Sequence, residues 1–321
     1  MNEGNRVSDC LHSRNSLNLI KEIDDLLSDR IRGIIAGNII GDMLGLPFEG
    51  LDFGNVKSPI ILKDPPDTII SNHISKYKCK VYSDDTSMFL ALFHSLYEKG
   101  RVDKINELTH YKKWLIDGEY TPDKKAFGFG KTTYKAVLTG VPGTSRDENG
   151  NGALMRSSII TPFYINKSDK SLEEASGESA SVTHAHPIAI FCNIIYNLLL
   201  KYLILGHDMH GSLSKCYDKY YNIIPDINDI FFEPIYYGKS GYVVSTLQTA
   251  IWLNVESRSF SEVIAKAISV GGDSDTILAV SGAIGGAIYG FDSFSEEEKS
   301  LALYTIKSYS KLEKFFNQPH F

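Results

Sequence analysis

The chain has 321 residues, of which 43% are hydrophobic and 22% are charged, so it contains enough apolar material for one large core or two modest ones. Its formal net charge at pH 7 is −6. This negative balance argues against nucleic acid as a bulk partner, because no basic surface is available for a phosphate backbone, although a single nucleotide remains a candidate ligand.

The four cysteines lie far apart in the chain, at Cys10, Cys79, Cys192 and Cys216. No CxxC pair and no histidine at zinc-site spacing accompanies them, so we interpret them as reduced thiols. The N-terminal segment is polar and lacks the apolar stretch of a signal peptide. These features predict a cytoplasmic protein, which we expect to be a monomer.

The N-terminal region changes character near residue 30. Residues 1–29 are polar and mixed in charge, and the helical spacing of Leu17–Leu27 predicts a short helix there. We interpret 1–29 as an extension and 30–321 as the main domain. The apolar stretch that follows contains glycines every four residues, at Gly33, Gly37, Gly41 and Gly45. Each interior glycine costs a helix about 1 kcal/mol relative to alanine, so a row of them predicts close approach of another backbone.

A second glycine row near the other end of the chain supplies the partner. It comprises Gly282, Gly286 and Gly290. We predict that the two helices pack against each other, so that the two ends of the domain meet. Apolar spacing predicts further helices over Thr86–Glu98, Lys131–Leu138, Pro187–Leu205, Val243–Asn254 and Ser261–Ser269. Runs that alternate at period two are few and short, so the sequence predicts a mainly helical single domain with its chemistry on loops.

The stretch Pro187–Leu205 is nearly long enough to cross a bilayer. However, Asn193, Asn197 and Lys201 fall four residues apart and form a polar stripe along one helical face. This pattern predicts a core helix with one edge facing solvent. We therefore expect no membrane anchor.

Two adjacent carboxylates, Asp84 and Asp85, follow Tyr82-Ser83 and precede a long apolar helix. The simplest explanation is helix capping, because an acidic residue in the first turn complements the helix dipole. Taken alone, that explanation is the commoner one.

A second acidic motif, Gly271-Gly272-Asp273-Ser274-Asp275-Thr276, also opens an apolar helix. Glycines ahead of two carboxylates let the backbone turn so that both point to one place, and capping needs only one of them. Together with the hydroxyls of Ser83 and Thr276, the four carboxylates form an all-oxygen set that suits Mg²⁺ or Mn²⁺ and suits zinc poorly. We expect two cations, because four carboxylates around one divalent ion leave uncompensated charge.

The segment Phe127–Thr132 ends in the GKT of a phosphate-binding P-loop. We reject that interpretation, because the required first glycine falls on Lys125 and no strand precedes the segment.

Five segments in this order, GxxxGDxLGLPxE, SDDT, NGNGALMR, THAHP and GGDSDT, resemble the ADP-ribosylglycohydrolase family over roughly Arg30 to Gly290. The resemblance implies an all-α, single-domain orthogonal helical bundle with a binuclear Mg²⁺ or Mn²⁺ centre. It implies that the cations are ligated from one side by Ser83, Asp84 and Asp85. It also implies ligation from the other side by Asp273, Asp275 and Thr276, with Glu49 beside the metals.

The resemblance also implies a ligand pocket. In the family, the loop that matches Asn149-Gly150-Asn151-Gly152, followed by Met155-Arg156, lines an ADP-ribose pocket. By residue type alone this loop is an ordinary turn, whose small residues also expose N–H groups to a diphosphate or ribose. His184 matches a family histidine that contacts the ribose or diphosphate, whereas we interpret His186 as a helix-start residue.

Gly128 and Gly130 match a glycine-containing family loop near the ligand. Some relatives carry an acidic residue in this loop, to which proton transfer has been assigned. Its equivalent here is Gly128, so that acid is missing or supplied elsewhere.

Glycosidic cleavage at ribose passes through an oxocarbenium-like state. The working hypothesis is that the cations hold the ribose 2′ and 3′ hydroxyls while Glu49 or Asp85 deprotonates the attacking water. The expected substrate is an ADP-ribosylated protein, with arginine as the modified residue.

Three alternatives stay open at this point. The first is an immunity protein against an ADP-ribosyltransferase toxin, which reverses the modification or binds the toxin through 1–29. The second is a catalytically inactive structural relative. The third is a binuclear hydrolase of phosphoesters.

Overall fold

The computed structural model describes the backbone of residues 4–320 and the side chains of residues 21–320. Throughout this part of the chain the regular structure is helical, and its β-type pairings are isolated bridges such as Lys57 with Tyr236 and Gly150 with Tyr242. The predicted all-α bundle is therefore confirmed.

The helices run in chain order as α1 (Gly4–Gly45), α2 (Pro66–Tyr77), α3 (Asp84–Lys99), α4 (Lys104–Asp117), α5 (Lys131–Thr139), α6 (Ile160–Tyr164), α7 (Asp169–Ala180), α8 (Pro187–Ile204), α9 (Met209–Tyr220), α10 (Val243–Val255), α11 (Phe260–Ile268), α12 (Ser274–Tyr289), α13 (Glu296–Ile306) and α14 (Ser310–Asn317). Short 3₁₀ turns link some of them, at η1 (Leu46–Phe48), η2 (Arg146–Glu148), η3 (Asn151–Ala153), η4 (Ser157–Ile159), η5 (Pro225–Phe231) and η6 (Phe291–Ser293). The five helices predicted from apolar spacing are all present, as α3, α5, α8, α10 and α11.

The first helix differs from its prediction. The sequence predicts a separate short helix over Leu17–Leu27, whereas α1 runs without a break from Gly4 to Gly45. Side chains of residues 21–30 are exposed or half-buried, and nearly every side chain from Ile31 to the end of α1 is buried. This change in burial falls beside the proposed boundary between 1–29 and 30–321, which remains a prediction.

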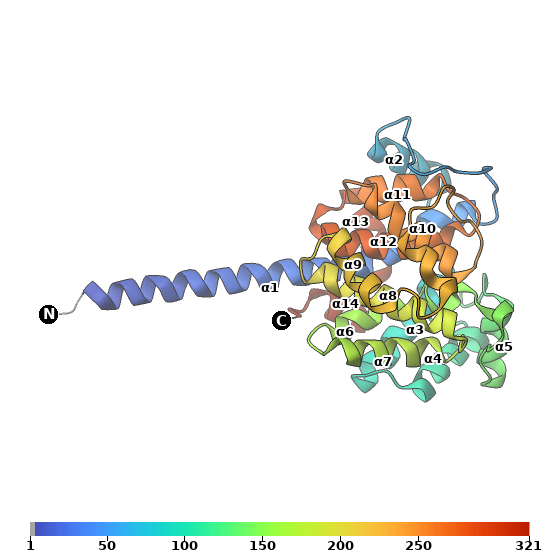
Figure 1. Cartoon of the computed structure of the whole chain (residues 1–321), viewed down its shortest axis with the longest axis horizontal. Helices are drawn as coiled ribbons and strands as arrows, with labels where there is room; N and C mark the ends of the chain where they lie inside the picture. Colours follow the sequence, from blue (N-terminus) through green and yellow to red (C-terminus); the bar gives the residue numbers. More distant parts are fainter. Residues whose placement is uncertain (1–3, 321) are drawn as a thin grey trace.

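The centre of the fold is the antiparallel contact between α1 and α12 (Figure 1). A Cβ atom added to Gly33 would overlap the carbonyl of Gly286, and one added to Gly37 would overlap the carbonyl of Gly282. The reverse also holds, because Cβ atoms on Gly282 and Gly286 would overlap the α1 backbone. The predicted packing of the two glycine rows is confirmed, and it sets the end of α1 against the start of α12.

The polar stripe of α8 does not face solvent, so that prediction is wrong. Asn193 and Asn197 have no exposed surface. Thr161 Oγ1 donates to Asn197 Oδ1 at 2.8 Å, and Asn197 Nδ2 donates to Ser157 Oγ at 3.2 Å. The stripe is buried because η4 and α6 supply polar partners, which the periodicity of α8 alone does not reveal.

Two helical segments are long and apolar enough to cross a membrane by length and composition, Lys21–Phe48 and Pro187–Ile204. Their most apolar windows are 78% and 72% buried inside the fold. Both segments thus pack as core helices.

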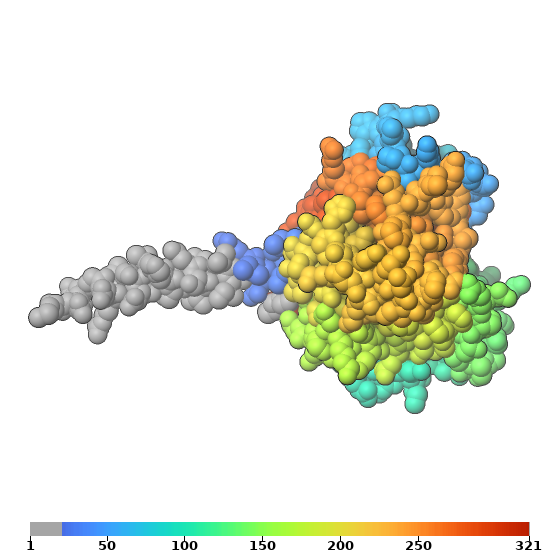
Figure 2. Space-filling model, viewed as in Figure 1, coloured from blue at the N-terminus to red at the C-terminus, as the bar shows by residue number. Residues whose placement is uncertain are grey.

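The other helices surround this central pair. Figure 2 shows the segment around α2 (blue) along one edge of the body, and α9 with the chain leading into α10 (yellow to orange) across the face. The cysteines with described side chains, Cys79, Cys192 and Cys216, are buried and unpaired. Cys10 lies outside the residues whose side chains are described.

We predict that Gly37→Ala destabilises the protein by about 2 kcal/mol or more, because the added methyl must displace the backbone of α12. Gly177→Ala in α7 is the control, since its Cβ would meet only side-chain atoms, the nearest at 3.3 Å. Urea denaturation of both variants measures the difference. Equal unfolding midpoints would contradict the tight contact.

Candidate metal centre and ligand pocket

The start of α3 is capped by Ser83 and not by the acidic pair. Ser83 Oγ accepts a hydrogen bond from the backbone N–H of Asp85 at 3.2 Å and donates to Asp85 Oδ2 at 3.1 Å. Asp84 and Asp85 stay in the first turn with 6% and 1% exposure. Capping therefore does not account for the two carboxylates.

Asp42 completes this turn, and the sequence analysis missed it. Its carboxylate accepts hydrogen bonds from the backbone N–H of Ser83 at 3.0 Å and of Thr86 at 2.9 Å. Asp42 is fully buried in α1, and burial, followed by the nearby charge of Asp275, raises its pKa to about 6. A charged residue inside an apolar, glycine-rich helix was the signal that could have identified it.

The start of α12 is set by two glycines with positive φ, Gly271 at +72° and Gly272 at +73°. Other residues rarely adopt this conformation, so the glycines allow the sharp turn that the sequence predicts. Gly272 N–H donates to Leu51 O, and Gly50 N–H donates to Gly272 O, both at 2.8 Å. These bonds tie the segment after η1 to the turn and set Glu49 beside α12.

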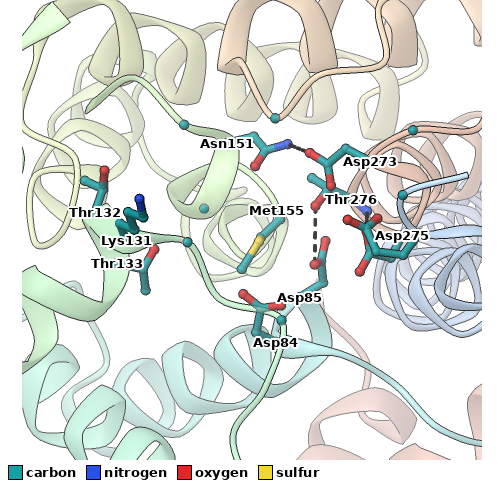
Figure 3. A pocket seen from close by; sticks show the side chains of 18 of the residues that line it. Asp84, Asp85, Lys131, Thr132, Thr133, Asn151, Met155, Asp273, Asp275 and Thr276 are labelled. Carbon is teal, nitrogen blue, oxygen red and sulfur yellow. Dashed lines mark hydrogen bonds between the residues drawn. The ribbon is translucent and has the colours of Figure 1, made fainter. Parts of the chain in front are cut away.

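Carboxylates from the two helix starts converge. One carboxylate oxygen each of Glu49, Asp273 and Asp275 lies within 4.8 Å of the others. Across the pocket, Thr276 Oγ1 approaches Asp85 Oδ2 at 3.4 Å, a contact between residues 191 positions apart. In Figure 3, Asp84 and Asp85 lie on one side of the acidic cluster, and Asp273, Asp275 and Thr276 lie on the other side. The predicted convergence is thus present.

Burial and mutual repulsion disfavour the charged forms of the carboxyls in this cluster. Burial, then the charges of Asp275 and Asp42, raises the pKa values of Asp84 and Asp85 well above their usual range. Asp85 Oδ1 is buried without a hydrogen-bond partner. Among the ion pairs of residues 21–320, none includes a carboxylate of this cluster.

The remaining carboxylates behave in the same way. Burial, followed by the charge of Asp275, raises the pKa of Asp273 to about 7, although Asn151 Nδ2 donates to Asp273 Oδ2 at 2.5 Å. Glu49 is solvent-exposed as a residue, but desolvation of its carboxyl and the proximity of Asp275 and Asp273 raise its pKa to about 9. Buried carboxylates without a positive partner are costly, and an all-oxygen set fits a hard divalent cation. The residues therefore fit a metal site.

The cluster forms one end of a cavity of about 560 Å³. That volume is within the range of small-molecule sites, roughly 300–1,000 Å³. The other end is lined by Gly130, Lys131, Thr132, Thr133, Gly150, Gly152 and His184, whereas Gly128 and Asn151 lie next to Asp84 and Asp273. Figure 3 shows Lys131, Thr132 and Thr133 opposite the acidic cluster, with Met155 between the two ends. The cavity therefore has an acidic end and a donor-rich end.

The predicted glycines have specific surroundings in this cavity. Gly128 has φ of +87°, and a Cβ there would overlap Asp84 Oδ1. A side chain at Gly128 would be strained by this φ and would displace the Asp84 carboxylate, so this position is suited to glycine and not to the acidic residue that some relatives carry. Gly130 precedes the first turn of α5, and Gly150 and Gly152 lie beside the ring of His184.

Asn149 and His186 act within the fold. Asn149 Nδ2 donates to Arg146 O at 2.9 Å, and its Oδ1 accepts from Ala189 N–H at 3.2 Å. His186 caps α8 by accepting from Ile188 N–H at 3.3 Å, as predicted.

Three basic residues near the cavity differ from the sequence interpretation or were missed by it. Arg156 was expected to line the pocket, but it is fully buried behind it. Lys131, set aside with the rejected P-loop pattern, lines the donor-rich end. Lys239 also lines the cavity, and its Nζ pairs with Asp52 Oδ1 at 2.8 Å. Lys131 was visible in the sequence, whereas nothing local distinguished Lys239.

An all-helical bundle that joins an acidic cluster to a glycine-lined pocket is the class of protein that the resemblance implies. The family model for ADP-ribosylglycohydrolase matches residues 23–314, and the chain belongs to this family. Family membership supports a hydrolase that acts on ADP-ribosylation.

Curated relatives and a solved structure agree with this assignment. The chain is 26% identical to the ADP-ribosylarginine hydrolase Tri1 of Serratia proteamaculans, over 86% of this chain and 75% of that protein. It is 26% identical to the ADP-ribosyl-[dinitrogen reductase] glycohydrolase of Rhodospirillum rubrum, over 82% and 87%. A solved structure described as an ADP-ribosylglycohydrolase-related protein complex superposes with a TM-score of 0.67 at 25% identity, covering 88% of this chain and 99% of that chain.

We predict that Asp42→Asn weakens Mn²⁺ binding by about tenfold or more, because the first turn of α3 loses an acceptor and the cluster loses a charge. Isothermal titration measures the affinity. Asp218→Asn is the control, since Asp218 is an exposed residue of α9. An unchanged affinity of the Asp42 variant would contradict the positioning role.

Proposed function

We propose that this protein is a metal-dependent hydrolase that removes ADP-ribose from a modified protein, with ADP-ribosylated arginine as its target. The observation that carries the proposal is a single cavity with carboxylates at one end and backbone and side-chain donors at the other. A ribose with a diphosphate matches that polarity, since its hydroxyls suit a metal site and its anionic oxygens suit donors. Two of the relatives are named for hydrolysis of ADP-ribosylarginine or of ADP-ribosylated dinitrogen reductase.

The proposed cofactors are two divalent cations, Mg²⁺ or Mn²⁺. The residues that would hold them are Ser83, Asp84, Asp85, Asp273, Asp275 and Thr276. Support comes from the buried carboxylates that lack a positive partner and from the unpartnered Asp85 Oδ1. Bound there, the cations would supply charge neutralisation and activation of water.

The donor-rich end is proposed to hold the diphosphate. The first backbone N–H groups of α5 have no hydrogen-bond partner within that helix. They lie at the positive end of the helix dipole, which favours binding of an anion. Lys131 adds a positive charge beside them. A side chain at Gly150 or Gly152 would occupy the space beside His184 or Thr133. The two glycines therefore leave this space open for the ligand.

The proposed proton acceptor is Glu49, with Asp85 as the alternative. Glu49 lies at the solvent-exposed mouth and within reach of Asp275. Positive charge in the acidic cluster would lower the pKa of Glu49, so that its carboxyl would be ionised. Glu49 would then take a proton from the water that attacks the ribose anomeric carbon, while the bond to the target nitrogen breaks. Because Gly128 supplies no acid, the proton held by Glu49 would pass to the departing guanidine.

An immunity role against an ADP-ribosyltransferase toxin would use the same site when it acts by reversing the modification. Binding of such a toxin through 1–29 concerns side chains that mostly lie outside the described residues. The cytoplasmic location and monomeric state also remain proposals.

We predict that Asp275→Ala lowers release of ADP-ribose from an ADP-ribosyl-arginine protein by at least about a thousandfold. The substitution removes one of the three carboxylates, with Glu49 and Asp273, that lie within 4.8 Å of one another. Chromatography of released ADP-ribose measures the rate. Asp218→Ala should retain full activity. Undiminished turnover in the Asp275 variant, or in the wild type after chelation, would rule out the proposed site.

We also predict that Mg²⁺ or Mn²⁺ raises the thermal unfolding midpoint of the wild type, since a ligand that binds the folded state stabilises it. The rise should disappear in Asp84→Asn, which removes one buried charge but retains side-chain volume. Differential scanning fluorimetry measures both. An equal rise in the variant would place the cations elsewhere.

A further inference from the structure

A fully buried arginine, Arg156, lies behind the donor-rich end of the cavity and has no part in the chemistry proposed above. Its guanidinium makes three directed hydrogen bonds. Nε donates to Tyr111 Oη at 2.9 Å, one terminal nitrogen donates to Thr183 Oγ1 at 2.9 Å, and the other donates to Gly152 O at 2.5 Å. One buried cation therefore contacts both the glycine loop and the residue before His184.

A buried carboxylate balances this cation. Tyr111 accepts from Arg156 and donates its hydroxyl hydrogen to Glu107 Oε2 at 3.3 Å. Ser179 Oγ donates to the same oxygen at 2.9 Å. Glu107 has no exposed surface, so a buried chain of hydrogen bonds joins the arginine to Glu107 through Tyr111, while Glu107 Oε1 has no hydrogen-bond partner.

The hydrogen bonds at Thr183 favour one tautomer of the neighbouring histidine. A threonine hydroxyl has one hydrogen and two lone pairs, and a guanidinium can only donate. Arg156 therefore occupies a lone pair of Thr183 Oγ1. The remaining side-chain partner of that oxygen among the described residues is His184 Nδ1, at 2.8 Å. The hydroxyl hydrogen has no other hydrogen-bond acceptor among the described residues, so a protonated Nδ1 would leave this buried hydrogen unpaired. This cost favours an unprotonated Nδ1.

A neutral imidazole with an unprotonated Nδ1 carries its hydrogen on Nε2. Burial, then the charge of Arg156, lowers the pKa of His184 to about 3 against a smaller opposing effect of Glu148, so the ring stays neutral near neutral pH. Nε2 faces the glycine loop, because Cβ positions on Gly150 and Gly152 would lie 3.5 and 3.7 Å from it. His184 also lines the cavity.

We propose that Arg156, acting through Thr183, is a positioning residue that holds His184 as the Nε2–H tautomer, so that His184 is a neutral hydrogen-bond donor to an anionic oxygen of the ligand and takes no part in proton transfer. The donor-rich lining at this end identifies the acceptor class as phosphate or diphosphate oxygens. That ligand assignment rests on the proposed function, whereas the tautomer does not.

The tautomer is tested directly by long-range ¹H–¹⁵N spectra of the full-length wild type, without ligand and near neutral pH. The chain has nine histidines, so His184→Asn assigns the signal. We expect a protonated Nε2 and an unprotonated Nδ1. A protonated Nδ1 would overturn the proposal whether or not the protein hydrolyses its substrate.

The role of the Thr183 hydroxyl is tested with a matched pair of variants. Thr183→Ser retains the hydroxyl and should keep the tautomer and the affinity for ADP-ribose within about twofold. Thr183→Val has a similar shape without the hydroxyl, and it should mix the tautomers and weaken ADP-ribose binding by about tenfold. Isothermal titration measures the affinities, and circular dichroism checks the fold.

Equal affinity and an unchanged tautomer in the valine variant would overturn the positioning role. If that variant does not fold, the wild-type spectra still decide the tautomer. Absence of ADP-ribose binding by a wild type that shows the Nε2–H tautomer would contradict the proposed function and support the tautomer assignment.

Discussion

The site depends on one packing constraint, the backbone contact between α1 and α12. Glycines at both surfaces let the two helices approach more closely than any side chain permits. The contact aligns the end of α1 with the start of α12, and it therefore brings Asp42 and Glu49 to Asp275. Residues far apart in the chain form one cluster because the glycine contact holds the two helices close together. A larger separation of the helices would open the core.

The second constraint is electrostatic. Carboxylates from α1, α3 and α12 share a small buried volume, and burial followed by the charge of Asp275 raises the pKa values of Asp42, Asp84, Asp85 and Asp273. Such an arrangement opposes folding unless positive charge enters it. The packing of the glycine rows, and the hydrogen bonds that Asp42 accepts from backbone N–H groups at the start of α3, hold the carboxylates together nonetheless. Buried carboxylates that lower the stability of the fold are typical of functional sites, and this arrangement fits the binding of hard cations.

The sequence predicts those parts of the fold and site that depend on residues close together in the chain. Glycines every four residues specify a close helix contact, and Gly271-Gly272 specify the turn before the acidic residues, since few other residues adopt that backbone. The helices α3, α5, α8, α10 and α11 follow from their own apolar spacing. The convergence of the two acidic motifs could be predicted because each contains more carboxylates than capping requires.

What the sequence does not reveal depends on contacts between distant segments. Asp42 is a single charge in an apolar helix, and its partners lie more than forty positions away. The stripe on α8 was assigned to solvent because the polar groups of η4 and α6 that bury it belong to other elements. Arg156 was expected in the pocket, whereas its role behind the pocket depends on α4 and on the loop before α8.

The central claim, that the starts of α3 and α12 together hold divalent cations, is tested most directly by anomalous diffraction from crystals soaked in Mn²⁺. The account predicts two manganese peaks between Asp84–Asp85 and Asp273–Asp275. An empty acidic cluster in crystals that bind manganese elsewhere would contradict it.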